Sequence, residues 1–540
     1  MAQVCALRIG VASTTNEGAK RPMVGGPPGR PGMGGGPMGR RPGMPDLTTG
    51  PIGMTLLTFS LPVLGTNILQ SLNGTGNAIW VSHALGAAAL TATTNANTIF
   101  FLMMGSVFGI TMAANLLIGQ AIGAGDRALA KRVVGAAIIF FLVLSSLIGV
   151  AGYTLTPAIL TAMQTPPDAK IDAIIYLRII FMAIPVVYFF SFVQMAQRGA
   201  GDSRTPFYFS LFAVAMDLIL NPLLIMGLGP FPKMGIAGSA AATLISQSLT
   251  LGIVIAYLYR TDSILVLKRS EWGLLRPDLD IMKTLVTKGL PMGLQMFVIS
   301  GAALIMTRFV NGYGSTTAAA YGAAIQLWTY VQMPAMAMGM AVSSMAAQNV
   351  GAGKMDRVEK VAGIGVLYAG ILSAVPIVII YMVEPIVLRL FLPAGSPSLP
   401  IAMHINAYVL WGFIPFGMSF ILSGIVRATG SVIPPLIAMV ISLWVIRIPF
   451  AITLQPHYGS DAIWWSFPLG SIASLIMAAS WFKWGPWRKA RLLDTIPHGD
   501  APDTGHGAPG GVEETEVAED ALRRGDPSAP NRQGSAALVE

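Results

Sequence analysis

Charged residues are scarce in this 540-residue chain, where they make up 11% of the sequence. A soluble domain carries about a quarter, because charged side chains cover the surface that faces water. Hydrophobic residues instead account for 54% of the chain, and the mean hydropathy is +0.64. This composition excludes a soluble protein of this length and indicates that most of the chain lies in lipid.

Cysteine and clustered histidine are also lacking. The one cysteine, Cys5, cannot form an internal disulfide, and the 5 histidines show no metal-ligand spacing. The net charge of +9 is spread over tails and short polar breaks between apolar stretches, where basic residues orient a membrane protein. We therefore expect no resident metal, no cofactor and no nucleic-acid partner.

Enzyme and nucleotide-binding motifs are missing as well. The segment GAGK at 351–354 resembles the end of a phosphate-binding loop, but Gln348 stands where the first glycine belongs and Met355 replaces the Ser or Thr. No nucleophile and base can be paired. We expect no enzyme, and any transport would use ion gradients instead of nucleotide hydrolysis.

Long apolar stretches alternate with short polar breaks along most of the chain. A helix needs about 20 mostly apolar residues to cross the hydrocarbon core, and lipid offers no partner to an unpaired backbone amide. We therefore predict an all-α membrane protein with twelve transmembrane helices, at 52–82, 88–118, 132–157, 171–197, 206–228, 236–259, 284–311, 317–347, 360–383, 402–425, 432–454 and 461–484.

Several short motifs occur twice, in the same order, at offsets of 228 to 230 residues. They are Leu61-Pro62 and Leu290-Pro291, QAIGAG at 120–125 and QNVGAG at 348–353, Pro185 and Pro415, and RGAG at 198–201 and RATG at 427–430. This pattern indicates a duplication. Six crossings per copy give both copies the same orientation, so we predict two six-helix bundles related by a pseudo-twofold axis along the membrane normal, with a substrate path between them.

The repeat and the composition together predict the domain boundaries. We expect a disordered Gly/Pro-rich tail at 1–50, in which Met44 is a second candidate start, and a disordered polar tail at 486–540. The first lobe would span 51–259 and the second 284–485, joined by a linker at 260–283.

Basic residues of the breaks lie mostly on one side of this predicted topology. Only Lys170, Lys233 and Arg389 fall on the other side. Loops rich in Lys and Arg stay in the cytoplasm. We therefore expect the linker and both termini to be cytoplasmic, in a multi-pass protein of a cell (inner) membrane.

Asp217 is the acidic residue placed deepest in a predicted crossing. It lies near the middle of the fifth, where a carboxylate costs about 2.5–3.5 kcal/mol on insertion scales. Other acids lie in tails, in loops or near helix ends, as Glu384 does in the ninth crossing, and the second half has none as deep. Burial favours the neutral form and a nearby cation the charged form. Asp217 is thus a candidate for exchanging a proton against a cation; the alternative is a fixed hydrogen-bonding role between helices.

Four motifs, taken together, resemble the multidrug and toxic compound extrusion (MATE) family of the MOP flippase superfamily. They are GQAIGAGD at 119–126, AQNVGAGKMDR at 347–357, RGAGDSRTPF at 198–207 and DLILNPLLI at 217–225, and the resemblance covers about 50 to 485. It implies an antiporter that expels organic cations and other amphipathic, drug-like compounds in exchange for H⁺ or Na⁺. We expect it to act as a monomer in the lipid bilayer.

The family's cation site implies a set of residues in the first half. It uses an aspartate in the first helix, an Asn and an Asp one turn apart in the fifth and a Thr in the sixth, which fall on Asn77, Asp217, Asn221 and Thr243, with Ser239 beside them. This chain departs from the commoner pattern, because Asn77 replaces the first acid and the order in the fifth helix is reversed. One carboxylate neutralises Na⁺ less fully than two, so we favour H⁺, with Na⁺ at Asp217 as the alternative.

Three further features have two readings each. Pro62 matches a family proline at which the first helix bends, or is an ordinary membrane-helix kink. Met333, Met336 and Met340 share a helix face and would line an adaptable cavity, or simply pack. Three arginines in the outer parts of their helices either extend toward headgroups or line an anion path: Arg178, Arg308 and Arg447.

Two rival functions remain open. A lipid-linked saccharide flippase of the same superfamily should have a more cationic central cavity and commonly fourteen helices. A polytopic membrane enzyme should show clustered His, Asp or Glu at one interface, which this sequence lacks.

Overall fold

The computed structural model describes residues 47–393 and 395–496. The predicted tails at 1–50 and 486–540 therefore lie largely outside the described residues. The first copy of the repeat forms helices α1 (Ile52–Leu85), α2 (Ala87–Gly123), α3 (Arg127–Ala162), α4 (Pro167–Gly199), α5 (Arg204–Met226) and α6 (Ile236–Arg260).

The second copy begins after the short helix η1 (Arg269–Leu274) of the linker. Its helices are α7 (Leu279–Asn311), α8 (Ser315–Gly351), α9 (Met355–Leu388), α10 (Ser398–Val409), η2 (Leu410–Gly412), α11 (Phe413–Ala428), α12 (Ile433–Val440), η3 (Ile441–Arg447), α13 (Ile448–Tyr458) and α14 (Asp461–Trp484), followed by η4 (Pro486–Lys489) and η5 (Leu493–Thr495). The segments α10–η2–α11 and α12–η3–α13 each run as one continuous span.

Eleven spans within the described residues are long and apolar enough to cross a membrane. The long helix outside that set is α8, whose residues 341–350 are all buried. A helix surrounded by protein does not need a lipid-like surface, so α8 can be less apolar than its neighbours. The predicted all-helical membrane fold is confirmed, while a twelfth crossing at α8 stays a prediction.

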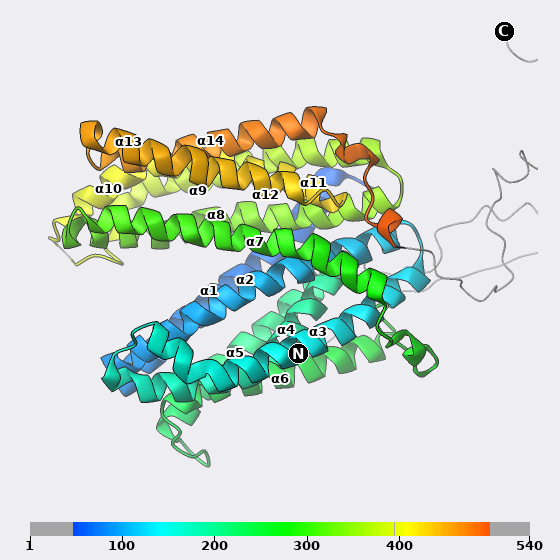
Figure 1. Cartoon of the computed structure of the whole chain (residues 1–540), viewed down its shortest axis with the longest axis horizontal. Helices are drawn as coiled ribbons and strands as arrows, with labels where there is room; N and C mark the ends of the chain where they lie inside the picture. Colours follow the sequence, from blue (N-terminus) through cyan, green and yellow to red (C-terminus); the bar gives the residue numbers. More distant parts are fainter. Residues whose placement is uncertain (1–46, 394, 497–540) are drawn as a thin grey trace, which may run out of the picture. The chain divides into compact units, whose positions relative to one another are not determined.

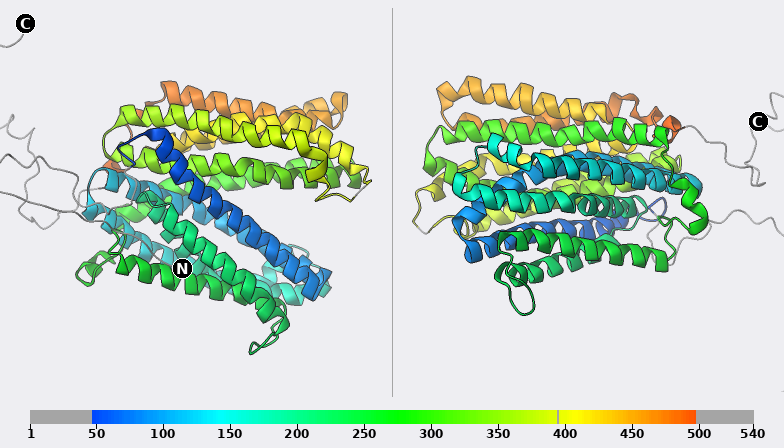
Figure 2. Two further views of the ribbon diagram at one scale, coloured as in Figure 1. Left: turned by 180° about the vertical axis from the view of Figure 1, so that it is seen from behind. Right: turned by 60° about the horizontal axis from the view of Figure 1, so that its bottom comes forward.

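Helices of the two copies group separately and meet through α1, α2, α7 and α8. In Figure 1, α1 to α6 lie together in the lower half and α7 to α14 in the upper half. Helix α2 packs against α4 in its own bundle and against α7 and α8 of the other, while α1 contacts both α5 and α8. Figure 2 shows α1, in blue, running obliquely between the two groups. The same four helices therefore join the bundles and carry part of each core.

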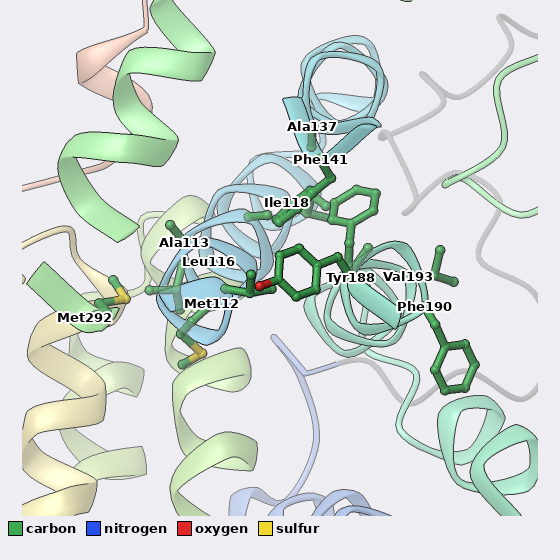
Figure 3. Packing of buried hydrophobic residues seen from close by; sticks show 14 of the residues in the cluster. Met112, Ala113, Leu116, Ile118, Ala137, Phe141, Tyr188, Phe190, Val193 and Met292 are labelled. Atoms are coloured by element: carbon green, nitrogen blue, oxygen red, sulfur yellow. The ribbon is translucent and has the colours of Figure 1, made fainter. Parts of the chain in front are cut away.

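The core of the first bundle is continuous with this junction. Figure 3 shows Met112 and Leu116 of α2 between Tyr188 and Phe141 on one side and Met292 of α7 on the other. Phe141 also packs on Phe192 of α4, with ring centroids 5.1 Å apart. Burial of such large side chains holds α2, α3, α4 and α7 together in the membrane through close van der Waals contact.

Glycine allows the two bundles to touch at the carboxyl ends of α2 and α8. Gly123 faces the backbone carbonyl of Gln348, and Gly351 faces that of Gln120. Gln120 Nε2 donates to the carbonyl of Ala428 at 2.6 Å, and Gln348 Nε2 donates to that of Gly199 at 2.8 Å. We call Gln120, Gly123, Gln348 and Gly351 the glycine–glutamine contact. The hydrogen bond from Gln348 to Gly199 is thus the counterpart, in the other repeat, of the bond from Gln120 to Ala428.

Short segments at both ends of the described chain pack against this contact. Leu47 is fully buried, and its carbonyl accepts a hydrogen bond from Asn349 Nδ2 at 2.9 Å. At the other end Trp487 and Leu492 are buried, and the Leu492 amide donates to Gln120 Oε1 at 3.0 Å. Residues 486–496 thus pack in place, unlike the disordered tail expected there, because large apolar side chains in this stretch find a site between helices.

Ion pairs hold the linker to α3. Lys131 Nζ lies 2.5 Å from Glu271 Oε1, and Arg132 Nε lies 2.6 Å from Asp278 Oδ2. Asp278 is also the N-cap of α7, where it accepts from the Ile281 amide at 3.2 Å. The hydrogen bond from Lys131 lowers the pKa of Glu271.

Substitution Gly123→Ala should separate the bundles at the glycine–glutamine contact, because the added methyl group meets a backbone carbonyl that cannot rotate away. Overpacking of this kind costs about 1–3 kcal/mol. We expect a lower midpoint of thermal unfolding for purified protein in detergent. Gly322→Ala in α8 is the matched control, since nothing lies within 4 Å of that position. Equal midpoints for the two variants would contradict this account of the contact.

Substitution Glu271→Gln should speed amide hydrogen exchange in residues 268–275 at neutral pH. The effect should be a few-fold, because a partly exposed pair is worth less than about 1 kcal/mol. A lowered pKa means that docking is present above the ordinary value of about 4.3 and is lost as pH falls through the pKa of folded Glu271. The difference between variant and parent should therefore vanish in acid. Asp262→Asn, which removes an exposed pair with Lys268, should leave exchange unchanged.

Candidate functional site

Asp217 lies in α5 and is buried, with 2% of its surface exposed. Hydrogen bonds reach its carboxylate from two other helices. Asn77 Nδ2 of α1 donates to Oδ2 at 3.0 Å, and Thr243 Oγ1 of α6 donates to Oδ1 at 3.2 Å. A neutral donor on each oxygen offsets part of the cost of placing a carboxylate in the membrane interior.

Asn221 completes this group from the same helix as the acid. Its Nδ2 donates to Asn77 Oδ1 at 2.7 Å and to the backbone carbonyl of Asp217 at 3.2 Å. Asn77 therefore donates with its nitrogen and accepts with its oxygen, which fixes the orientation of its amide group. We call Asn77, Asp217, Asn221 and Thr243 the Asp217 network. The structure brings these four predicted residues together.

A cavity of about 90 Å³ borders Asp217. One water needs about 10–15 Å³, so several waters fit. Polar side chains supply much of its wall: Gln70, Asn73, Gln194, Ser210, Ser246 and Gln247. We call this space the polar cavity. It places the acid beside a space that suits water, and not against lipid.

Ser239 lies one helical turn before Thr243. Its backbone carbonyl is 3.5 Å from Thr243 Oγ1, while its own buried hydroxyl has no hydrogen-bond partner among the described residues. The buried oxygens Asn73 Oδ1 and Asn221 Oδ1 also lack partners there. Oxygen atoms of this kind suit water or a hard cation.

Basic side chains do not neutralise the acid in this part of the molecule. None of the ion pairs formed by the described residues includes Asp217. Those residues also contain no group of three or more His, Cys, Asp and Glu that could hold a metal ion. The site therefore combines one carboxylate with neutral amides and hydroxyls.

A family model described as MatE matches residues 62–223 and, a second time, residues 291–453. The chain belongs to the MATE family of transporters. The two matches start 229 residues apart, which agrees with the internal repeat of this MATE protein.

Curated relatives point to the same family. The chain is 34% identical over 441 residues to the probable multidrug resistance protein YoeA of Bacillus subtilis, covering 81% of this chain and 95% of that protein. It is 32% identical over 453 residues to the probable multidrug resistance protein YpnP of the same organism, covering 83% and 98%.

Solved structures share the MATE fold. An outward-facing multidrug resistance MATE transporter of the MOP superfamily superposes with a TM-score of 0.75 at 20% identity, over 81% of this chain and 96% of that one. A MOP superfamily transporter from Pyrococcus furiosus gives 0.73 at 21% identity, over 81% and 96%. The protein thus combines the sequence of the MATE family with the MATE fold. The family is not one of enzymes, which confirms that expectation.

Residues of the polar cavity were missed by the sequence analysis of this MATE chain. Asn73 lies one turn before Asn77, and Ser246 lies three residues after Thr243, so a search for polar residues on the same helix face would have found both. Gln194 of α4 carries no such signal, because only tertiary packing brings it to the cavity.

Two further predictions concern Pro62 and the methionine face of α8, which lie outside the Asp217 network. Helix α1 is continuous through Pro62, so a bend there stays a prediction. Met333 is buried and Met336 is half-buried, whereas Met340 Sδ accepts a hydrogen bond from Arg198 Nη1 at 3.7 Å. Met340 therefore contacts a buried guanidinium, and the cavity-lining role of the three methionines also stays a prediction.

Glu384 lies near the end of α9, as expected, and is nevertheless buried. It is 5% exposed and accepts from Asn406 Nδ2 at 2.8 Å. Asn406 Oδ1 in turn accepts from Trp328 Nε1 at 2.8 Å. Helix α10 covers this end of α9 and buries the carboxylate.

The three arginines differ in their surroundings. Arg308 is exposed, as expected for a side chain that extends toward headgroups. Arg178 stacks over the ring of Tyr153 at 5.0 Å. Arg447 stacks over the ring of Phe467 at 3.3 Å and borders a second cavity, in the second bundle.

Substitution Asn77→Ala should destabilise the protein more than Thr243→Val. The first removes both a donor to Asp217 and an acceptor for Asn221, whereas the second removes one hydrogen bond and keeps the side-chain shape. A buried polar group left without its partner costs about 1–3 kcal/mol. Thermal unfolding in detergent should rank the midpoints as parent, then Thr243→Val, then Asn77→Ala. The reverse order would show that Asn77 is not the centre of the network.

Proposed function

We propose that this MATE transporter is an antiporter that exports organic cations and other amphipathic drugs in exchange for protons taken up at Asp217. The proposal depends on one observation, the position of the Asp217 network beside the polar cavity. Water in that cavity would give protons a route to the carboxylate, while burial makes the charged form costly unless a cation is near.

Proton uptake changes the hydrogen bonds of the network in a defined way. The ionised carboxylate accepts from Asn77 at Oδ2 and from Thr243 at Oδ1. A proton on Oδ1 is tolerated, because the Thr243 hydroxyl can turn and accept. A proton on Oδ2 would face the Asn77 amide nitrogen, which cannot accept, and Asn221 holds that amide in place. Oδ1 is therefore the expected protonation site, on the side of α6.

Sodium is the alternative coupling ion at the same site. The unpartnered oxygens of Asn73, Asn221 and Ser239 would suit it. A single carboxylate balances its charge less fully than two would, so protons remain the favoured ion. The membrane potential adds about 2.3 kcal/mol per 100 mV for each net charge that moves inward.

Alternating access would use the two lobes expected at 51–259 and 284–485. The glycine–glutamine contact would have to open for access from its side. Basic residues follow both of its helices, with Lys131 after α2 and Lys354 after α8. With both termini in the cytoplasm, this contact would close the inner side, and Asp217 would then be reached from outside.

The site favours drug export over lipid-linked saccharide transport by the same superfamily. The polar cavity holds an acid and no base, and the relatives YoeA and YpnP are described as probable multidrug resistance proteins. An anionic pyrophosphate would be repelled by Asp217. We further propose a cell (inner) membrane location and a monomer, since each chain already contains both bundles.

Substitution Asp217→Asn should uncouple transport in reconstituted liposomes. Dye efflux under an imposed proton gradient should fall at least about tenfold, because the variant cannot take up or release the proton. A sodium gradient should drive little efflux in the parent. Glu384→Gln is the matched control, since it neutralises a buried carboxylate in the other bundle. Full efflux by Asp217→Asn under either gradient would disprove the coupling role.

A further inference from the structure

A second cavity, of about 240 Å³, lies among helices of the C-terminal bundle. Its walls come from α7, α8, α10, η2, α11, α12, η3 and α14. Five aromatic residues line it: Tyr321, Trp328, Phe413, Phe416 and Phe467. Trp328 packs edge-on against Phe467 at 5.2 Å and lies 6.0 Å from Phe413. We call this space the aromatic cavity.

Arg447 is the one charged residue on the wall of the aromatic cavity. The span Ile433–Tyr458 continues beyond the predicted end at 454, so Arg447 lies deeper in it than the outer position expected from the sequence. A charge there is costly unless it faces a cavity or a partner. Its guanidinium stacks on Phe467, its Nε is buried without a hydrogen-bond partner, and no described carboxylate forms an ion pair with it. The charge therefore has an aromatic support and no counter-ion within the described protein.

Backbone geometry holds Arg447 at this wall. It ends the π-helical segment η3, which also supplies Ser442 and Leu443 to the cavity. Pro449 follows in α13 and cannot donate an amide hydrogen bond, so the wider π-helical turn accommodates the missing bond. Segments of this type are frequent at functional sites and rare elsewhere.

Trp328 is held at the cavity wall by hydrogen bonds that lie outside the cavity. Trp328 Nε1 donates to Asn406 Oδ1, whose Nδ2 donates to Glu384 Oε1, each at 2.8 Å. The carboxylate of Glu384 is thus turned toward Asn406, and Glu384 does not line the cavity. The indole ring keeps a fixed orientation, and the interior of the cavity keeps a positive charge.

We propose that the aromatic cavity binds a small aromatic carboxylate, with the carboxylate on Arg447 and the ring between the aromatic side chains. A planar guanidinium can donate two parallel hydrogen bonds to a carboxylate while its face stays on Phe467. Tyr321 and Trp328 offer ring surfaces for edge and stacked contacts. Pockets for drug-sized ligands measure about 300–1,000 Å³. A cavity of about 240 Å³ therefore suits a smaller ligand of one or two rings.

This site is independent of the proposed antiport at Asp217. It lies in the other bundle and selects the opposite charge. The transporter would thus accept organic anions in one half and respond to cations in the other.

The test is calorimetric titration of 2-naphthoate into the full-length protein in nanodiscs, with empty nanodiscs as the blank. The parent should bind 2-naphthoate at least about tenfold more tightly than 2-naphthylmethylammonium, which has the same rings and the opposite charge. Arg447→Gln should weaken 2-naphthoate binding by about 10- to 100-fold, as expected for a lost charge-assisted bond. Arg308→Gln, which removes an exposed charge from the same bundle, should leave it unchanged.

Two further measurements test whether binding depends on the cavity and on the aromatic ring of the ligand. Ser471→Leu keeps Arg447 and fills part of the cavity, and it should also weaken binding; Ser471 bonds only the Phe467 carbonyl of its own helix, so this variant should fold. Octanoate carries the charge without a ring and should bind at least about tenfold more weakly than 2-naphthoate. Equal binding of octanoate, equal binding of the cationic naphthyl compound, or unchanged affinity in Ser471→Leu would overturn the proposal.

Failure here is distinguishable from failure of the antiport proposal. Asp217→Asn should bind 2-naphthoate as the parent does, whatever its effect on dye efflux. Loss of naphthoate binding in that variant would contradict the independence of the two sites.

Discussion

A carboxylate in the middle of a membrane-spanning helix must be supplied with polar partners, and in this transporter they come from two neighbouring helices. Asn77 of α1 and Thr243 of α6 donate to Asp217 of α5. These bonds offset the cost of burial and at the same time link helices that would otherwise pack only through apolar contacts. A change in the protonation of Asp217 would therefore change the contacts among α1, α5 and α6, as the proposed antiport requires.

Sequence reasoning predicted the helices well because lipid imposes a simple requirement. Every crossing needs a long apolar stretch, and eleven spans in the described chain satisfy that requirement by composition alone. The repeat predicted the arrangement of the bundles, because duplicated contacts such as those of Gln120 and Gln348 recur at one offset. The apolar composition of the crossings also made Asp217 a candidate site residue, since a single acid stands out in an apolar helix.

Features that depend on packing could not be predicted in this way. The sequence places Glu384 near the end of a helix but does not show that α10 covers it. Residues 486–496 looked like part of a polar tail, yet Trp487 is fully buried. Arg447 left two interpretations open, because only the folded bundle shows that its guanidinium rests on Phe467 beside a cavity. The family resemblance, and not composition, carried the assignment of Asn77, Asn221 and Thr243.

The glycine–glutamine contact also depends on the end of the described chain. Gln120 Oε1 accepts from the backbone amides of Leu492 and Leu493, while its Nε2 donates to Ala428 of the other bundle. One side chain thus ties together α2, α11 and the peptide that follows α14. An affinity tag, reporter fusion or truncation placed close behind Ile496 would disturb the hydrogen bonds of Leu492 and Leu493 to Gln120. Such a change could therefore alter the contact between the two bundles as well as the end of the chain.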